Sequence, residues 1–462
     1  MKRIRNIHFI GIGGIGMCGI AEVMLNQGYK VSGSDVSPGD NVSRLIELGA
    51  KVTIGHSADN IENADVVVIS SAIDKENPEL LRAHEMGIPV VPRAEMLSEL
   101  MRKKNGIAVS GTHGKTTTTS MIASMLDHAG MSPTYVIGGR LLKNDLNASL
   151  GESEYFIAEA DESDGSFLLF HPTISIVTNI DNDHLSVYHG SMEELVAAFR
   201  QFISDIPFYG CAILCADDKY INELLPEIHR RVLTYGFDSS ATVYCREMTQ
   251  TESGVNVHVV SKLYDIDSVV TISQYGRHNV LNALACICVG LELNIDFKLI
   301  ASSLASFAGI SRRFNTTGME MTGGRHITVI DDYGHHPTEM ANVIETTRNV
   351  FPGRRLVFVF EPHRYSRVRD LFDAFVETLF KADYQLVLPV YAASETETHG
   401  MSSSVICDSL RSLGAKDAHT VSDSEALFSV LEHVLEDGDV VLFMGAGNVG
   451  RIVKQFIEGA TI

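Results

Sequence analysis

Basic residues are scarce in this sequence: 37 lysines and arginines stand against 58 aspartates and glutamates, a formal net charge of −21. The shortage argues against general nucleic-acid binding, because a protein that neutralises many phosphates needs a net basic footprint. It does not exclude a small anionic ligand, since a local arginine cluster can hold a phosphate on an acidic protein.

Long apolar runs are missing as well. No uninterrupted apolar stretch approaches the ~20 residues that a membrane helix needs. The first residues, MKRIRNIHFIGIGG, pass from a short basic segment directly into a strand pattern, whereas a secretory signal would show a longer apolar region and a small-residue cleavage site. We therefore expect a soluble, cytoplasmic protein without membrane insertion.

Cysteines are few, odd in number and scattered, with seven in the chain. The two close pairs, Cys211 with Cys215 and Cys286 with Cys288, lack the C-x-x-C spacing of metal and redox sites and lie in apolar runs. Buried free thiols in a reducing compartment are the expected state.

The length of 462 residues is about three times the ~150-residue prior for one domain. Three short apolar runs, starting near Asn6, Gly106 and Asp439, end in glycine-rich turns that lead into helical periodicity. This pattern is typical of parallel sheets with crossover helices. The sequence predicts an α/β protein with three domains over residues 1–105, 106–312 and 313–462.

The first glycine run follows a strand pattern and opens a helix. Gly11, Gly13 and Gly16 match G-x-G-x-x-G, and Asp35 ends the next strand at about the spacing of a ribose-binding acid. Such glycines let the backbone approach a pyrophosphate at a helix N-terminus. The run predicts a site for a nucleoside diphosphate. NAD bound to an oxidoreductase, or a tight turn without a ligand, would also explain it.

The second glycine run is more specific. Residues 111–116, GTHGKT, form a shortened P-loop between a strand and a helix, with Val109 where the full motif has glycine. The backbone N–H groups of such a turn cradle phosphates, Lys115 is expected to reach the β and γ oxygens, and the Thr116 hydroxyl is expected to ligate Mg²⁺. An NAD-dependent oxidoreductase would not explain this motif. A regulatory ATPase without ligase activity would explain it.

Acidic residues follow the next two predicted strands, where carboxylates face a nucleotide crevice and can complete the metal site of a P-loop. They are Glu159, Asp161, Glu162, Asp164, Asp181 and Asp183, with His184 directly after them. We expect most of these acids to be solvated.

Further polar clusters occur along the second half of the chain. The arginines after the strand RRLVFVF are a candidate anion clamp, and a third glycine run, 445–450, is interpreted as a structural turn. The remaining candidates are His278, Asn279 and Asn282 at a helix start; Arg312 and Arg313; Asp331, Asp332, Tyr333, His335 and His336; and His363, Arg364, Arg367 and Arg369.

Seven motifs together resemble the motif series of the Mur ligases, in the family's order. They are GIGGIGMCGIAEV, SGTHGKTTTT, EADESDGSF, GRHNVLNA, SRRF, DDYGHHPTE and PHRYSR. The resemblance implies a Rossmann-like domain for a UDP-linked substrate, a central P-loop ATPase-type domain and a C-terminal Rossmann-like domain.

Within the family, the sequence is most similar to the ligase that joins L-alanine to the lactyl carboxylate of UDP-N-acetylmuramate in bacterial peptidoglycan synthesis. The resemblance implies that ATP phosphorylates this carboxylate and that the amine of L-alanine attacks the acyl phosphate, giving amide, ADP and phosphate. It further implies Mg²⁺, or Mn²⁺ in its place, a bacterial cytoplasmic location and a monomer or weak homodimer.

The resemblance also implies roles for individual residues. Lys115, His184, His335 and Arg364 are expected to be catalytic, and Thr116, Glu159 and His184 to bind the metal ion. The nucleotide is expected at Gly111, Thr112, His113, Gly114, Lys115, Thr116, Thr117, Asn279, Asn282, Arg313, Asp332 and Tyr333. The substrates are expected at Gly11, Gly13, Gly14, Ile15, Gly16, Asp35, Ser70, Ser71, His335, Arg364 and Arg367.

The sequence departs from the family pattern at four positions: Ser186, Val187, Glu361 and Ser394. These departures bear on details around the site rather than on the reaction. The alternative within the family is the murein tripeptide ligase, which acts on the same UDP-sugar, but its N-terminal turn is less regular than GIGGIGM.

Overall fold

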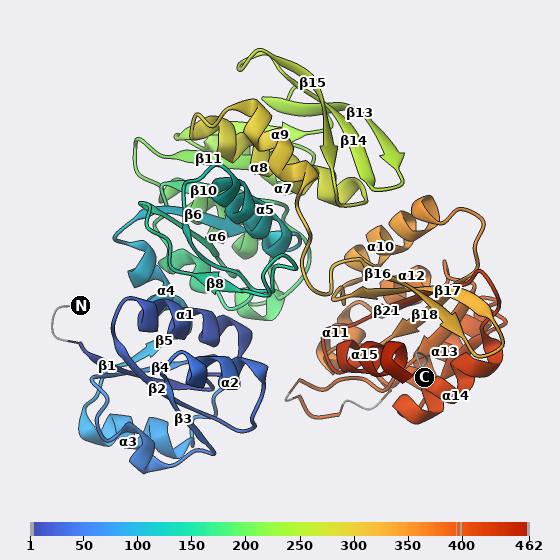
Figure 1. The fold of residues 1–462 in the computed structure, drawn as a ribbon, viewed down its shortest axis with the longest axis horizontal. Coiled ribbons are helices and arrows are strands. Elements are labelled where there is room, and N and C mark those ends of the chain that lie inside the picture. Colours follow the sequence, from blue (N-terminus) through green and yellow to red (C-terminus); the bar gives the residue numbers. More distant parts are fainter. Residues whose placement is uncertain (1–3, 394, 398–399, 460–462) are drawn as a thin grey trace. The chain divides into compact units, whose positions relative to one another are not determined.

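The computed structural model describes residues 4–393, 395–397 and 400–459, which form an α/β protein with three sheets, as predicted (Figure 1). The described chain packs into two compact units. The first holds residues up to 249, 254–274 and 279–309, and so contains the N-terminal and central sheets. The second holds residues 250–253, 275–278 and 310–459, with the third sheet. The domain bounds expected from the sequence stay a prediction.

The N-terminal sheet is parallel, with strand order β3-β2-β1-β4-β5. Its strands are β1 (Asn6–Ile10), β2 (Lys30–Asp35), β3 (Lys51–Ile54), β4 (Val66–Ile69) and β5 (Val90–Pro92). Its helices are α1 (Ile15–Asn26), α2 (Asp40–Glu47), α3 (Pro78–Met86) and α4 (Arg93–Met101), with a 3-10 turn at Ala58–Ile61. Helices α1 and α4 lie on the side of this sheet nearer the central sheet, and α3 lies on the opposite side (Figure 1).

A buried polar network lies at the carboxyl ends of these strands, around Glu79 of α3, which has no exposed surface. Its carboxylate accepts hydrogen bonds from Ser34 Oγ (2.7 Å) and Asn60 Nδ2 (2.6 Å), and lies 3.0 Å from His8 Nε2. Burial raises the pKa of Glu79, but these hydrogen bonds and the attraction to His8 outweigh it and lower the pKa to about 2.

The central sheet has ten strands in the order β15-β14-β13-β12-β11-β10-β6-β9-β7-β8. They are β6 (Asn105–Ser110), β7 (Thr134–Val136), β8 (Ala148–Ser149), β9 (Tyr155–Glu159), β10 (Ile174–Val177), β11 (Cys211–Cys215), β12 (Arg231–Gly236), β13 (Val243–Thr251), β14 (Gly254–Ser261) and β15 (Ile266–Ile272). The helices are α5 (Lys115–His128), α6 (Met192–Ser204), α7 (Lys219–Leu224), α8 (Arg277–Glu292) and α9 (Phe297–Ala305), with 3-10 turns at Ser166–Leu169, Leu185–Tyr188 and Leu225–Glu227.

The third sheet has the order β16-β17-β21-β18-β19-β20. Its strands are β16 (Asn315–Met321), β17 (Arg325–Asp332), β18 (Leu356–Phe360), β19 (Tyr384–Val387), β20 (Ala418–Thr420) and β21 (Val440–Met444). Its helices are α10 (Pro337–Val350), α11 (Tyr365–Asp370), α12 (Phe372–Leu379), α13 (Ser403–Ser412), α14 (Ser424–Val434) and α15 (Val449–Gly459).

Strand β18 shows why this sheet is covered on both faces. Phe358 and Phe360 pack in one buried cluster with residues of α10, α12 and α13. Val357 and Val359 pack in a second cluster with residues of α14 and α15. Because successive side chains of a strand point to opposite faces, a strand that is apolar throughout must be buried on both sides.

Several elements were not predicted. Strands β14 and β15 pair antiparallel, β8 pairs antiparallel with β7, and β16 pairs antiparallel with β17. Strand β16 is therefore an edge strand of the third sheet. The seven cysteines are free and buried, as predicted.

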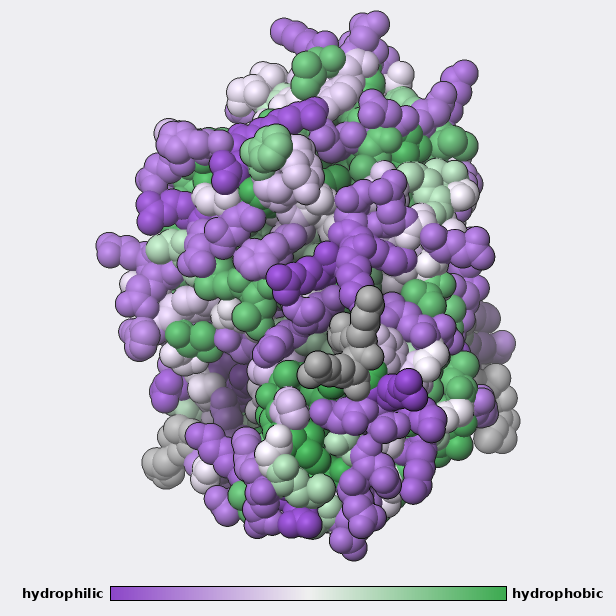
Figure 2. Space-filling model, turned by 90° about the vertical axis from the view of Figure 1, so that its left-hand side faces the viewer, coloured by the Kyte–Doolittle hydropathy of each residue, from purple (hydrophilic) through white to green (hydrophobic). Residues whose placement is uncertain are grey.

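The surface agrees with the composition. Hydrophilic residues cover most of the face in Figure 2, and hydrophobic residues appear there in small separate groups. Among the described residues, no helix has both the length and the apolar composition to cross a membrane.

The Glu79 network makes stability depend on pH in a defined direction. Because folding lowers the pKa of Glu79 from 4.5 to about 2, the charged form stabilises the fold fully above pH 4.5, and this contribution is lost as the pH falls towards 2. In urea unfolding, wild type should lose about 1 to 2 kcal/mol more than Glu79→Gln between pH 7 and pH 3.5. The matched control is Glu85→Gln, on an exposed side chain of α3, and an equal loss in Glu79→Gln and wild type would contradict the assignment.

Candidate active site

The P-loop turn has the predicted strand–turn–helix context, between β6 and the first residue of α5, Lys115. Its glycines are required by conformation and space. Gly111 has φ 124°, and a Cβ there would lie 2.2 Å from Thr178 Oγ1. Gly114 has φ 84°, and a Cβ there would lie 2.6 Å from Asn282 Oδ1. Any side chain at either position would push the turn away from the segments that hold it.

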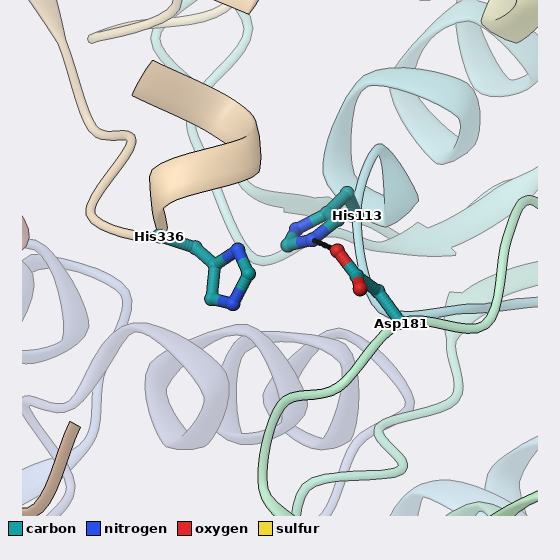
Figure 3. Close-up of side chains that lie close together, drawn as sticks. All are labelled: His113, Asp181 and His336. Carbon is teal, nitrogen blue, oxygen red and sulfur yellow. Dashed lines mark hydrogen bonds and ion pairs between the residues drawn. The ribbon is translucent and has the colours of Figure 1, made fainter. Parts of the chain in front are cut away.

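The segment after β10 fixes this turn. The backbone N–H of His113 donates to Asn179 Oδ1 (2.8 Å), and Thr178 Oγ1 donates to the His113 carbonyl (2.6 Å). The His113 Nε2 atom lies 3.0 Å from Asp181 Oδ2, the pair joined in Figure 3. Asp181 therefore orients the P-loop histidine.

Lys115 is held by carboxylates. Its ammonium lies 2.8 Å from Glu162 Oε2 and donates to the carbonyl of Gly111 at 2.7 Å. Burial works against the charged form of Lys115, but attraction to Glu162, Asp161 and Glu159 outweighs it and raises the pKa to about 12. Lys115 is therefore a permanent cation whose present partners are acids, and a phosphate would have to compete with them for it.

A second acid lies beside the first turn of α5. Thr116 Oγ1 donates to Glu159 Oε2 at 3.1 Å, and the backbone N–H of Gly138 donates to Glu159 Oε1 at 2.7 Å. A hydroxyl and a carboxylate at this separation are the hard oxygen donors that Mg²⁺ prefers. The donor set fits the predicted metal ion, although its binding stays a prediction.

The expectation that most of the acids are solvated was wrong. Of the six acids, only Asp164 is exposed, and Glu162 is buried. The other four acids are partly buried. Asp161 accepts a hydrogen bond from the N–H of Ser163, and Glu162 forms an ion pair with Lys115. The partners outweigh burial at Asp161, whose pKa is lowered, whereas burial outweighs the attraction to Lys115 at Glu162, whose pKa is raised. The sequence pattern did not reveal these partners.

His184 caps a 3-10 turn rather than ending a strand, with φ 57° and its Nε2 atom 3.3 Å from Asp183 Oδ2. A neutral imidazole that is oriented by a carboxylate is a common metal ligand. Its role at the metal ion stays a prediction.

A cavity of about 320 Å³ in the first unit extends from the first glycine run to Glu159 and Asp161, the acids at and after the end of β9. It is lined by Gly11, Gly14, Ile15, Gly16, Met17, Ser70, Ser71, Arg93, Leu97, Val136, Ile137, Gly138, Glu159 and Asp161. Six of the predicted substrate residues thus share one cavity with the predicted metal ligand Glu159.

Gly13 and Asp35 do not line this cavity. The Asp35 carboxylate accepts the N–H of Gly13 at 2.8 Å, and a Cβ on Gly13 would lie 2.9 Å from it. Asp35 therefore shapes the glycine turn, and its predicted contact with a substrate stays a prediction.

The predicted asparagines reach the P-loop. Asn282 Oδ1 accepts from Thr118 Oγ1 (3.1 Å), and its Nδ2 donates to Asn279 Oδ1 (3.1 Å). Both lie in the first turns of α8, as the sequence suggested. Thr117, in α5, is buried.

The second unit gathers aromatic and basic residues after β17 and β18. The guanidinium groups of Arg312 and Arg313 each lie 5.3 Å from the ring centre of Tyr333. The His335 ring lies 5.4 Å from that of His363, and Arg367 Nη1 lies 3.3 Å from His363 Nδ1. The predicted His335 and Arg367 are therefore linked through His363.

Arg364 and Asp332 have backbone roles. Arg364 has φ 70° at the start of α11, and its N–H donates to the carbonyl of Tyr391. Asp332 accepts the N–H groups of Phe314 and Gly334. Burial raises the pKa of Asp332 to about 6.

The third glycine run is a structural turn. Glu361, one of the departures from the family pattern, accepts the N–H groups of Asn448 and Val449 at the start of α15, both at 3.0 Å. A carboxylate of the chain thus satisfies the helix N-terminus. Ser186 and Val187 are exposed, and Ser394 lies outside the described residues.

Family comparisons match nearly the whole chain. The Mur ligase family catalytic domain matches residues 6–105, the Mur ligase middle domain 109–290, and the Mur ligase glutamate ligase domain 312–447. The UDP-N-acetylmuramate–L-alanine ligase of Hydrogenovibrio crunogenus is 48% identical over 99% of both chains. The chain belongs to the Mur ligase family.

Solved structures agree with this assignment. The UDP-N-acetylmuramate–alanine ligase MurC of Thermotoga maritima has a TM-score of 0.84 and 31% identity, covering 99% of both chains. A murein peptide ligase of Psychrobacter arcticus has a TM-score of 0.73 and 23% identity, covering 99% of this chain and 98% of that one. The second similarity supports the fold alone.

Sequence reasoning missed Arg93. It is the first residue of α4 and the one basic residue among the described residues that line the cavity, and a Cβ on Gly16 would lie 3.1 Å from its Cδ atom. The guanidinium thus lies against the first turn of α1, where helix N–H groups and dipole favour an anion. The sequence feature that could have identified Arg93 is its position directly after β5, at the same edge of the sheet as the first glycine run.

We expect Arg93→Ala to weaken the binding of UDP by at least about tenfold, because a charge-assisted hydrogen bond contributes about 1.5–3 kcal/mol. Arg93→Lys should recover only part of the affinity, since lysine keeps the charge but lacks the fork of donors. Calorimetric titration with UDP measures both variants. Affinity in Arg93→Ala equal to wild type would remove Arg93 from the site.

Proposed function

We propose that this protein is an ATP-dependent ligase that joins L-alanine to the lactyl carboxylate of UDP-N-acetylmuramate. The observation that carries the proposal is the single cavity that the first glycine run shares with Glu159 and Asp161, beside the P-loop lysine. A UDP-sugar bound with its diphosphate at Gly14–Gly16 and Arg93 would extend its carboxylate towards this acidic end. The products are UDP-N-acetylmuramoyl-L-alanine, ADP and phosphate.

The residues of the central domain support phosphoryl transfer. Lys115 stays protonated and would neutralise the γ-phosphate, and the N–H groups of residues 111–116 would surround the phosphates. Thr116 and Glu159 would hold Mg²⁺, which supplies charge neutralisation on the transferring group. To contact the γ-phosphate, the Lys115 ammonium would have to break its ion pair with Glu162. Nucleotide binding would therefore be accompanied by the loss of this ion pair.

The second unit supplies the residues proposed to complete the site. Arg313, Asp332 and Tyr333 are proposed to contact ATP, and His335, Arg364 and Arg367 to hold the carboxylate and amino-acid end of the substrates. Support for four of them is the aromatic and basic cluster that Arg313, Tyr333, His335 and Arg367 form with His363. The cytoplasmic location and the monomer or weak homodimer also stay predictions.

The murein tripeptide ligase is not favoured as an alternative. The relatives with full-length coverage at 48% and 31% identity both carry the L-alanine activity in their names. The regular glycine run around Gly11–Gly16 lies against Arg93 and is compatible with either UDP-sugar enzyme, so the acceptor decides between them.

Phosphate release from ATP and Mg²⁺ tests the reaction. With UDP-N-acetylmuramate present, we expect release with L-alanine and much less with L-Ala-γ-D-Glu-diaminopimelate; glycine and L-serine measure selectivity within the pocket. Release with the tripeptide alone would overturn the proposal in favour of the recycling ligase. If no phosphate were released with any acceptor, from protein that binds ATP, ligase activity would be overturned altogether.

Lys115→Ala should abolish turnover while leaving the binding of UDP-N-acetylmuramate within about threefold of wild type. Lys115 does not line the substrate cavity, and its loss removes charge neutralisation from the phosphoryl group. Calorimetry with the UDP-sugar and a coupled ADP assay measure the two properties. Loss of both together would place the two ligands at one site.

A further inference from the structure

Residues 137–147 link the first glycine run to Glu159, and both line the substrate cavity. The segment joins β7 to β8, whose antiparallel pairing closes it into a hairpin. It is fixed internally, since Ile137 N–H donates to the Asn147 carbonyl and Leu141 N–H to the Leu146 carbonyl. All of its contacts described below lie within the first compact unit.

One end of this hairpin holds the acid proposed to bind the metal ion. Gly138 N–H donates to Glu159 Oε1 at 2.7 Å, while Glu159 Oε2 accepts from Thr116. There is no room for a side chain at Gly138, because a Cβ would lie 2.8 Å from Glu159 Oε2. The hairpin backbone thus sets where the Glu159 carboxylate stands.

The same hairpin also holds the first glycine run through two side chains, those of Arg140 and Asn147. Arg140 Nη2 donates to Asn41 Oδ1 at 2.5 Å, and Asn41 Nδ2 donates to the Gly13 carbonyl at 2.7 Å. Independently, Asn147 Nδ2 donates to the carbonyl of Ile15 at 2.9 Å, with the Asn147 side chain buried. Both contacts run from the central domain to the turn that would face the diphosphate.

Helix α1 lies directly on this hairpin. A Cβ on Gly19 would lie 3.1 Å from Asn147 Nδ2 and 3.2 Å from both the Ala148 Cβ and Val136 Cγ1 atoms. Helix and hairpin are therefore in backbone-close contact, and a shift of one must move the other because packed interfaces deform little. A continuous set of contacts runs from the glycine run to Glu159.

We propose that the hairpin over residues 137–147 couples the UDP-sugar site to the nucleotide–metal site, with Arg140 and Asn147 as positioning residues. The inference rests on the proposed function. Nucleotide and metal bound at Thr116 and Glu159 fix the Gly138 end, and the fixed hairpin holds the glycine run in the shape that accepts the diphosphate. Because coupling between two sites is reciprocal, bound UDP-sugar strengthens nucleotide binding by the same factor.

The test measures binding, not turnover. Calorimetry gives the dissociation constant of UDP-N-acetylmuramate with and without Mg²⁺ and a non-hydrolysable ATP analogue. In wild type, we expect the analogue to tighten binding at least fivefold. In Arg140→Ala and in Asn147→Ala, we expect this ratio to fall to below about twofold, while each ligand alone binds within about fivefold of wild type.

The variant Asn41→Asp tests the hydrogen bond to Gly13 with almost no change in the volume of the side chain. Aspartate keeps the acceptor for Arg140 but loses the donor to Gly13, so it should lose the coupling as Arg140→Ala does. The control is Lys143→Ala at the exposed tip of the same hairpin, where the nearest acid oxygen, on Asp127, is 3.8 Å away. It should keep the wild-type ratio. Thermal unfolding of each variant checks that the fold is retained.

The outcomes are distinguishable. The ratio is that of the dissociation constants of UDP-N-acetylmuramate without and with the ATP analogue. A ratio near one in wild type, or an unchanged ratio in folded Arg140→Ala, Asn147→Ala and Asn41→Asp, would overturn the coupling and leave the proposed function standing. Wild-type protein that binds the ATP analogue but not UDP-N-acetylmuramate would overturn the proposed function itself.

Discussion

The ion pair between Lys115 and Glu162 constrains the rest of the site. A buried lysine can remain charged only where acids surround it, and here Glu162, Asp161 and Glu159 provide that environment. Removing one partner of such a pair is costly, about 3–5 kcal/mol, because the other charge is left uncompensated. The P-loop, the acidic segment after β9 and the asparagines of α8 can therefore be understood as one structure built around a fixed positive charge.

The same constraint explains how the site can exchange ligands. Phosphate oxygens offer Lys115 the negative charge that Glu162 provides without a nucleotide, so the lysine need never be left unpaired. In the proposed function, Thr116 and Glu159 would hold the metal ion, and their oxygen donors already lie 3.1 Å apart. The charge of Lys115 would thus be compensated by Glu162 in the free protein and by phosphate in the nucleotide complex.

Much of this arrangement could be predicted from the sequence, because strand–glycine–helix turns follow from local chemistry. The positions of Gly11–Gly16, residues 111–116, Asn279 and Asn282 on such turns needed only hydrophobic pattern and glycine spacing. The burial of Glu162 could not be predicted, since it depends on contact with Lys115, which lies at the start of α5. Neither could the place of Arg93, which lies against Gly16 only once two helices pack. The antiparallel strands β14 and β15 were missed because the turn between them, residues 262–265, contains no glycine. The glycine pair at 323–324 between β16 and β17 is a hairpin signal that the strand–glycine–helix pattern passed over.

The proposed reaction is that ATP activates the carboxylate of a UDP-sugar bound in the cavity that the first glycine run shares with Glu159 and Asp161. Transfer of oxygen tests it most directly. With UDP-N-acetylmuramate carrying ¹⁸O in its lactyl carboxylate, L-alanine, ATP and Mg²⁺, mass spectrometry of the released phosphate should find one ¹⁸O atom per molecule, because the acyl phosphate keeps a carboxylate oxygen on phosphorus when the amine displaces it. Phosphate without ¹⁸O, formed together with the amide product, would contradict the account.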